Sequence, residues 1–147
     1  MLFGVVYVFL AAFIALFSSF IISSSLQFLS ALFGYQLQQE TNIDDGFINV
    51  LIVAPIVESI LLFFMVYLLR VFLGERKPLI GFIVITMFFS MHFNVFWFYA
   101  FTTLPLFAIS ILSLFYWEEK TVKGSFFVIL SIHVINNMSA YILDSIY

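Results

Sequence analysis

The sequence predicts an all-α membrane protein, a single bundle of about five transmembrane helices. Of the 147 residues, 65% are hydrophobic and only 9% are charged, and the mean hydropathy is +1.21. A soluble globular domain carries roughly 25% charged residues, so this chain has too few charges for a surface that faces water. Long apolar runs separated by short polar stretches complete the pattern of a polytopic membrane protein.

The first predicted span covers about 2–30. No positive charge precedes it, and its apolar run is too long for a signal peptide, so we expect it to remain as a transmembrane helix. It is also too long for one straight crossing of roughly 30 Å of hydrocarbon. We therefore expect the three serines at 23–25 to mark a bend or the point where the helix leaves the membrane. The polar segment 35–46 follows, and the second span is predicted at about 47–70.

The other three spans are predicted at about 79–101, 104–116 and 125–143. A turn between the third and fourth is indicated by Thr102, Thr103 and Pro105, because proline suits the first turn of a helix. The core that bears the motifs described below covers about 50–140 of this single domain.

The basic residues predict the orientation in the membrane. All five lie at the loops 70–78 and 117–124: Arg70, Arg76, Lys77, Lys120 and Lys123. Five alternating spans place these two loops on one side, and the segments 35–46 and 102–104 on the other side contain no basic residue. The positive-inside rule therefore predicts a cytoplasmic N-terminus and an external C-terminus.

The composition also excludes some functions. The chain has no cysteine, which excludes disulfides, thiolate zinc sites and thiol catalysis. It has no basic patch of the kind that binds nucleic acid. The expected surroundings are the lipid bilayer.

Apart from tyrosines, three titratable side chains lie inside the predicted spans: Glu58, His92 and His133. Such residues are costly in a membrane and usually face the bundle interior or a water-filled cavity. Counted from the predicted outer ends, they lie about 11, 9 and 10 residues deep, so their depths agree within roughly 3 Å. We therefore expect one shared site. Asn137 joins it, because it lies one helical turn after His133 on the same face.

A structural explanation of these polar residues stays open. A buried histidine bonded to a carbonyl is ordinary, and asparagines often join membrane helices, which is the interpretation we prefer for Asn136. A Glu58–histidine pair that serves only to offset the cost of burial is the strongest structural alternative.

Three short motifs occur in order: APIVES at 54–59, FFSMH at 88–92 and HVINN at 133–137. Together they resemble the CPBP (Abi) family, which comprises CAAX prenyl proteases of the second type and bacteriocin-processing enzymes. That family has Glu-Glu-x-x-x-Arg, Phe-x-x-x-His and His-x-x-x-Asn on separate membrane helices. The resemblance implies an intramembrane protease of a prokaryotic cell membrane. Its expected substrate is a membrane-associated or lipidated peptide or protein, with roles in bacteriocin processing or immunity.

The first motif departs from the family at two positions. Ser59 stands where the family has its second Glu, and Phe63 stands where it has Arg. These positions are four residues apart and suit an ion pair. Since both partners are missing together, no unpaired charge is left buried. We infer that a structural pair was replaced while Glu58, His92, His133 and Asn137 were kept.

Water is the expected nucleophile, because no cysteine is present and no serine has an identifiable paired base. Glu58 and His92 would hold and deprotonate the water, while His133 and Asn137 would stabilise the oxyanion. These roles follow the family as well as the chemistry. Glu58, His92 and His133 also form a plausible ligand set for a divalent metal such as zinc, with the fourth position left for water.

Three other functions stay open on sequence grounds. A non-catalytic relative acting in immunity, regulation or assembly is favoured by the lost Glu and Arg of motif one. His92 and His133 on two helices are also compatible with a bis-histidine haem, although Glu58 at the same depth fits poorly there. A proton or ion pathway would need more than one layer of polar residues.

Overall fold

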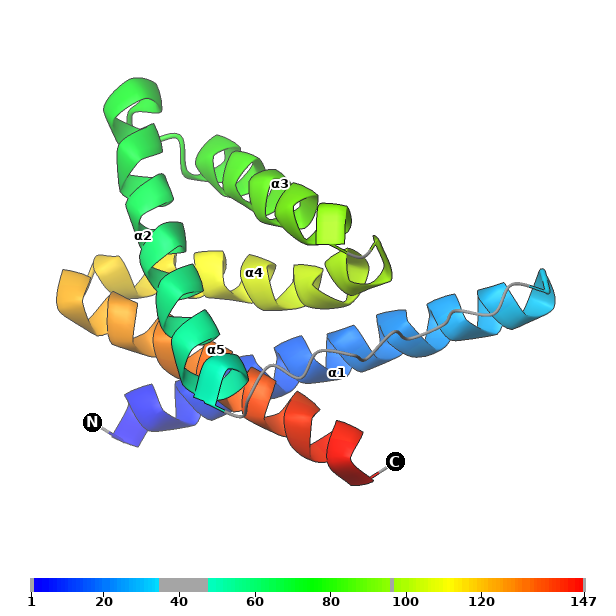
Figure 1. The fold of residues 1–147 in the computed structure, drawn as a ribbon. Coiled ribbons are helices and arrows are strands. Elements are labelled where there is room, and N and C mark those ends of the chain that lie inside the picture. The colour runs from blue at the N-terminus through cyan, green and yellow to red at the C-terminus, as the bar shows by residue number, and fades with distance from the viewer. Residues whose placement is uncertain (1, 35–47, 96, 147) are drawn as a thin grey trace.

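The computed structural model describes residues 2–34, 48–95 and 97–146, and these residues form helices without any strand. The five long helices are α1 (Leu2–Leu32), α2 (Ala54–Leu73), α3 (Lys77–Val95), α4 (Trp97–Glu118) and α5 (Val122–Ile146) (Figure 1). A short π-helical turn, η1 (Asn49–Val53), leads directly into α2. Each of the five helices is long and apolar enough to cross a membrane. The predicted all-α fold with five apolar helices is confirmed.

The predicted boundary between the third and fourth spans is wrong. Helix α3 ends at Val95 and α4 begins at Trp97, and Pro105 lies inside α4, which has 22 residues. The hydroxyl groups of Thr102 and Thr103 each donate a hydrogen bond to the carbonyl of Tyr99 at 3.0 Å, so both threonines are satisfied within the helix. Membrane helices tolerate proline because nearby groups satisfy the freed backbone, and a turn signal from soluble proteins is therefore misleading here.

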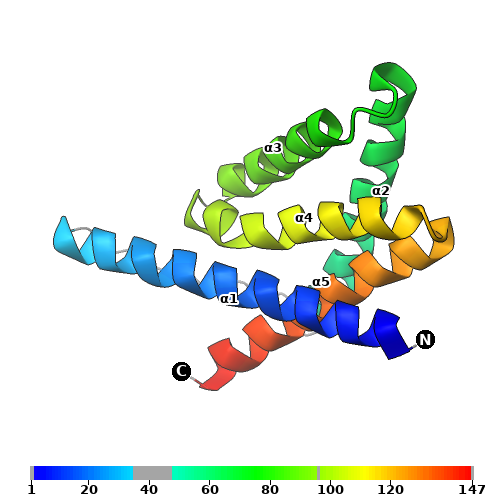
Figure 2. The ribbon, with the colours of Figure 1, turned by 180° about the vertical axis from the view of Figure 1, so that it is seen from behind.

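The first helix continues without interruption through the serines at 23–25. It has 31 residues, which corresponds to about 46 Å. Its first half packs into the bundle through small residues, of which Ala12 and Ala15 are buried, and small residues allow membrane helices to approach closely. Its second half extends away from the other helices (Figure 2). The predicted polar segment 35–46 lies outside the described residues.

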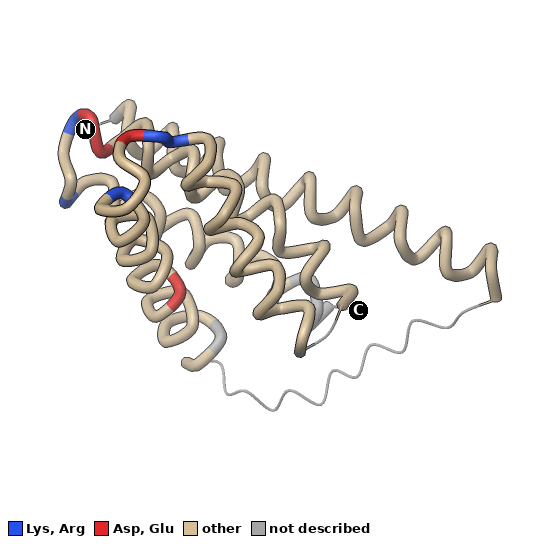
Figure 3. The backbone as a smooth tube through the Cα atoms, turned by 90° about the horizontal axis from the view of Figure 1, so that it is seen from above, with Lys and Arg blue, Asp and Glu red and all other residues tan. Residues whose placement is uncertain are grey.

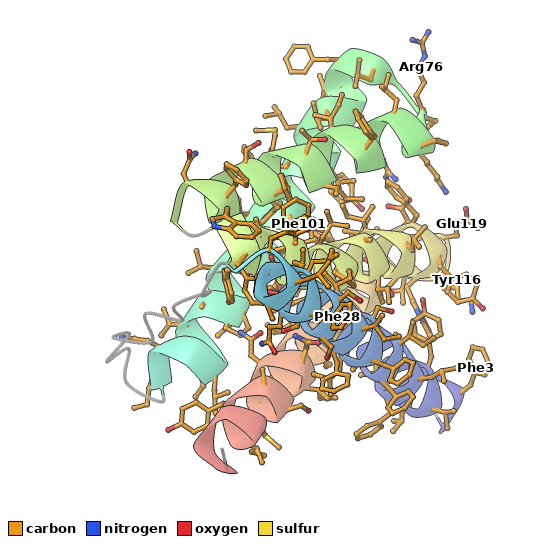
Figure 4. The ribbon with its side chains drawn as sticks, turned by 90° about the vertical axis from the view of Figure 1, so that its right-hand side faces the viewer. Phe3, Phe28, Arg76, Phe101, Tyr116 and Glu119 are labelled. Carbon is orange, nitrogen blue, oxygen red and sulfur yellow. The ribbon has the colours of Figure 1, made fainter. Side chains whose placement is uncertain are left out.

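Helix α4 is the centre of the bundle. It packs against α1, α3 and α5, while α2 packs against α3 and α5. In the most apolar part of α4, 50% of the residues are buried, whereas the corresponding share is at most 28% in any other helix. One buried cluster joins α2, α3, α4 and α5, and a second joins α1, α4 and α5. The aromatic side chains Phe3 and Phe28 point outward from α1, as expected for a helix in lipid (Figure 4).

The basic residues gather at one end of the bundle, where the N-terminus also lies (Figure 3). Glu118 of α4 forms an ion pair with Arg70 of α2, and it also lies 3.6 Å from the Lys77 ammonium of α3. Lys77 also lies 2.6 Å from Glu119, and this hydrogen bond lowers the pKa of the Glu119 carboxyl. Because three helices share these contacts, this charged end fixes the position of α2 and α3 against α4.

Candidate functional site

Glu58 and His133 meet between α2 and α5. Nε2 of His133 lies 2.9 Å from Oε2 of Glu58, which is the length of a good hydrogen bond from the imidazole N–H to the carboxylate. The His133 side chain is 4% exposed and the Glu58 side chain 27%. The carboxylate is therefore held by a buried donor and remains accessible from one side.

His92 approaches the same carboxylate from α3. Its Nε2 lies 3.8 Å from Oε1 of Glu58, and its Nδ1 lies 2.9 Å from the carbonyl oxygen of Phe88. The carbonyl can only accept, so Nδ1 carries a proton, and in the neutral ring Nε2 keeps a lone pair that faces Glu58. A separation of 3.8 Å is too long for a direct hydrogen bond but suits a water that bridges the two atoms.

The helices that carry these residues are defined by local signals. Pro55 lies in the first turn of α2, directly after the π-helical turn η1, where the N–H of Ala54 bonds to the carbonyl of Asn49. At the other end, Gly74 adopts a φ of 64°, and its N–H bonds to the carbonyl of Arg70 at 2.9 Å. Thr121 lies before the first turn of α5, and its hydroxyl accepts a 3.4 Å hydrogen bond from the N–H of Gly124.

The predicted equal depth of the three residues rested on a wrong helix end. Because α3 ends at Val95, His92 lies near the end of its helix rather than well inside it. Measured along each helix from its end at the charged side of the bundle, Glu58, His92 and His133 lie about 22, 22 and 16 Å away. The three residues meet because α2, α3 and α5 cross at large angles (Figure 1).

The other residues of the three motifs are placed as follows. Asn137 lies one turn after His133 on α5 and is half-buried, and its part in the site stays a prediction. Ser59 is buried, and its hydroxyl has no hydrogen-bond partner among the described residues. The Phe63 ring packs edge-on against Phe126 of α5, with ring centroids 5.7 Å apart. Aromatic packing between α2 and α5 therefore occupies the place where the family has its arginine.

Two aromatic residues of α4 belong to the surroundings of the site, although no sequence pattern distinguishes them. The Phe107 ring lies 5.1 Å from the His92 ring and 5.7 Å from the His133 ring. The Tyr99 ring lies 5.4 Å from His92. Neither residue belongs to a motif, and the predicted break at 102–104 assigned them to different helices.

The positions of Glu58, His92 and His133 test whether these residues can hold the expected metal ion or haem. Within the described ranges, no group of three or more histidine, aspartate or glutamate side chains is arranged to hold a metal ion. Nε2 of His133 instead lies 2.9 Å from the Glu58 carboxylate. For a bis-histidine haem the two Nε2 atoms must face one iron, whereas here both face the carboxylate of Glu58. Neither a zinc nor a haem site fits this arrangement.

The arrangement supplies the parts of a general acid–base site. It contains a carboxylate 2.9 Å from a buried imidazole nitrogen and a second imidazole 3.8 Å from its other oxygen. Comparison with known proteins finds no matching family model, no matching curated protein and no matching solved structure.

Proposed function

We propose that this chain is an intramembrane peptidase of the CPBP type, which hydrolyses a peptide bond in a membrane-associated or lipidated peptide. The observation that carries the proposal is the Glu58 carboxylate, which two histidines from two other helices approach at 2.9 and 3.8 Å. An ionisable triad inside apolar helices is costly, and it is usually retained where it has a function.

In the proposed reaction, a water binds between Oε1 of Glu58 and Nε2 of His92. Glu58 takes a proton from this water as the oxygen attacks the peptide carbonyl carbon, and the carbonyl oxygen becomes an oxyanion. Glu58 then passes the proton to the leaving amine when the C–N bond breaks, so the carboxylate is regenerated. His92, fixed by the Phe88 carbonyl, orients the water through its lone pair.

His133 and Asn137 keep the proposed role of stabilising the oxyanion. Nε2 of His133 lies 2.9 Å from Glu58. In the absence of substrate, His133 therefore orients the Glu58 carboxylate. In the proposed complex the oxyanion forms beside Glu58 and accepts the same His133 N–H, which Glu58 attracts less strongly once the water has protonated it.

The chain is proposed to lie in a prokaryotic cell membrane with its charged end in the cytoplasm. The positive-inside rule supports this orientation, because all five basic residues lie at or beside the two loops of that end. The site lies about 16–22 Å along the helices from that charged end.

The proposal is tested with purified protein in lipid nanodiscs and quenched fluorogenic peptides, with and without a prenyl group. We expect Glu58→Gln to lower kcat/KM at least about 100-fold, the usual range for loss of a general base. Glu75→Gln at the exposed charged end is the matched control and should retain activity. A Glu58→Gln variant with wild-type turnover contradicts the mechanism.

A non-catalytic role in immunity, regulation or assembly is the second candidate. Two observations favour it: the replacement of the family's Glu and Arg by Ser59 and Phe63, and the direct Glu58–His133 contact, which also suits a structural pair. This alternative expects Glu58→Gln to leave the biological phenotype intact, whereas the peptidase proposal expects its loss with the protein still folded and inserted.

A further inference from the structure

Phe107 of α4 contacts the side chains of both site histidines. Its ring centroid lies 5.1 Å from that of His92 at an interplanar angle of 54°, and 5.7 Å from that of His133 at 86°. It also stacks on Phe88 at 4.4 Å. One apolar side chain therefore joins α4 to the parts of α3 and α5 that carry the site.

This aromatic ring has little freedom to move. Phe107 is 2% exposed and Phe88 is fully buried, and both belong to the buried cluster shared by α2, α3, α4 and α5. Interiors of this kind are packed as closely as organic crystals, so a displaced ring must displace its neighbours. The position of Phe107 is thus fixed by the bundle.

We propose that Phe107 is a positioning residue that sets the ring orientation of His92 and His133 toward Glu58. The χ2 angle of histidine has a broad, roughly two-fold energy profile, so its own torsional preference does not fix the direction of Nε2. An aromatic ring in edge-on or tilted contact narrows the range of χ2 angles that the imidazole can adopt. Such contacts contribute about 0.5–1.5 kcal/mol beyond burial. Phe107 restrains both imidazoles at once.

The consequence for catalysis rests on the proposed peptidase function. Misplacement of a reacting group by about 1 Å can cost roughly 100-fold in rate. Because Phe107 itself offers no proton or lone pair, its loss should lower kcat while KM changes little. The effect on the orientation of the histidines does not depend on whether the chain is an enzyme.

The chain allows a direct test, since it contains only two histidines. Protein labelled with ¹³C and ¹⁵N in histidine alone gives two imidazole spin systems by NMR in nanodiscs. In the wild type, we expect nuclear Overhauser contacts from the Phe107 ring to both imidazoles. Their absence overturns the proposal without the need for any variant.

The variant for this test is Phe107→Leu, which keeps an apolar side chain in the core. We expect both imidazole resonances to shift and broaden, and Phe107→Tyr, which restores the ring, to return them toward the wild type. Leu106→Ala is the matched control, because Leu106 is the adjacent residue of α4, equally buried, and belongs to the other cluster. It should lower stability while leaving both histidine resonances in place.

The possible results separate the two proposals. Wild-type imidazole resonances in folded Phe107→Leu overturn the positioning role, whatever the activity. If the resonances shift as expected and the wild type cleaves peptides, kcat should fall about 10- to 100-fold in Phe107→Leu and less than about two-fold in Leu106→Ala. Shifted resonances in a protein without peptidase activity retain the positioning role and contradict the proposed function alone.

Discussion

The hydrogen bond between Glu58 and His133 can be measured by a double-mutant cycle. The two side chains lie 2.9 Å apart on α2 and α5, and His133 is almost fully buried. Glu58→Gln keeps the size of the acceptor and removes its charge. His133→Leu removes the donor and keeps an apolar side chain. The two single variants and the double variant together isolate the part of the contact that depends on the Glu58 charge.

The expected magnitude follows from the kind of hydrogen bond. A hydrogen bond to a charged group contributes about 1.5–3 kcal/mol and a neutral one about 0.5–1.5 kcal/mol. Glu58→Gln should therefore cost about 1 kcal/mol of the free energy of unfolding. His133→Leu should cost about 2 kcal/mol, because it leaves a partly buried carboxylate without its donor. Side-chain hydrogen bonds in membrane proteins couple by about 0.6 kcal/mol on average, so we expect a coupling energy near 1 kcal/mol.

The assay is reversible unfolding in mixed micelles by increasing amounts of SDS, followed by tryptophan fluorescence. The chain has two tryptophans. Trp97 begins α4, and Trp117 packs near the start of α1. The control cycle pairs Glu58→Gln with Ser90→Ala, because the Ser90 hydroxyl bonds to a carbonyl of its own helix. This control should show additive effects.

A coupling energy within the usual additivity error of about 0.3–0.5 kcal/mol for Glu58 and His133 refutes the reasoning. It means that the Glu58 charge does not interact with His133 in the membrane-like environment. The candidate site would then lose its best-defined contact, and the proposed orientation of the carboxylate would have no support.

Three further predictions concern the bundle. Glu118→Gln should destabilise the protein by about 3 kcal/mol in the same assay, because the Glu118 side chain is 7% exposed and its loss of charge leaves Arg70 only the exposed Glu75, 3.9 Å away; a change below about 1 kcal/mol contradicts this. Ala15→Leu should cost about 1–3 kcal/mol through overpacking of α1, whereas Phe13→Leu on the exposed face should be nearly neutral, and equal effects contradict the placement of α1. Arg76→Cys, the only cysteine in the variant, should react with a membrane-impermeant maleimide only in permeabilised cells, and labelling of intact cells reverses the proposed topology.

The sequence alone was sufficient for the class of fold and for three residues of the site. Low charge and long apolar runs require every backbone group to bond within the chain, and in lipid that condition leads to helices. Inside those runs, Glu58, His92 and His133 stood out because ionisable groups are rare there. This signal depends on residue type alone, so it survived the error in the boundary between the third and fourth spans.

Tertiary structure decided how these residues meet and what surrounds them. The sequence placed them at one depth by counting along helices, yet α3 ends at Val95 and the contacts arise from the angles at which the helices cross. Phe107 could not be predicted, because an apolar residue among many becomes distinctive only through its neighbours in space. Composition and periodicity act along one chain segment, whereas the 2.9 Å contact joins Glu58 and His133, which are 75 residues apart in the sequence and lie on two helices packed by the whole bundle.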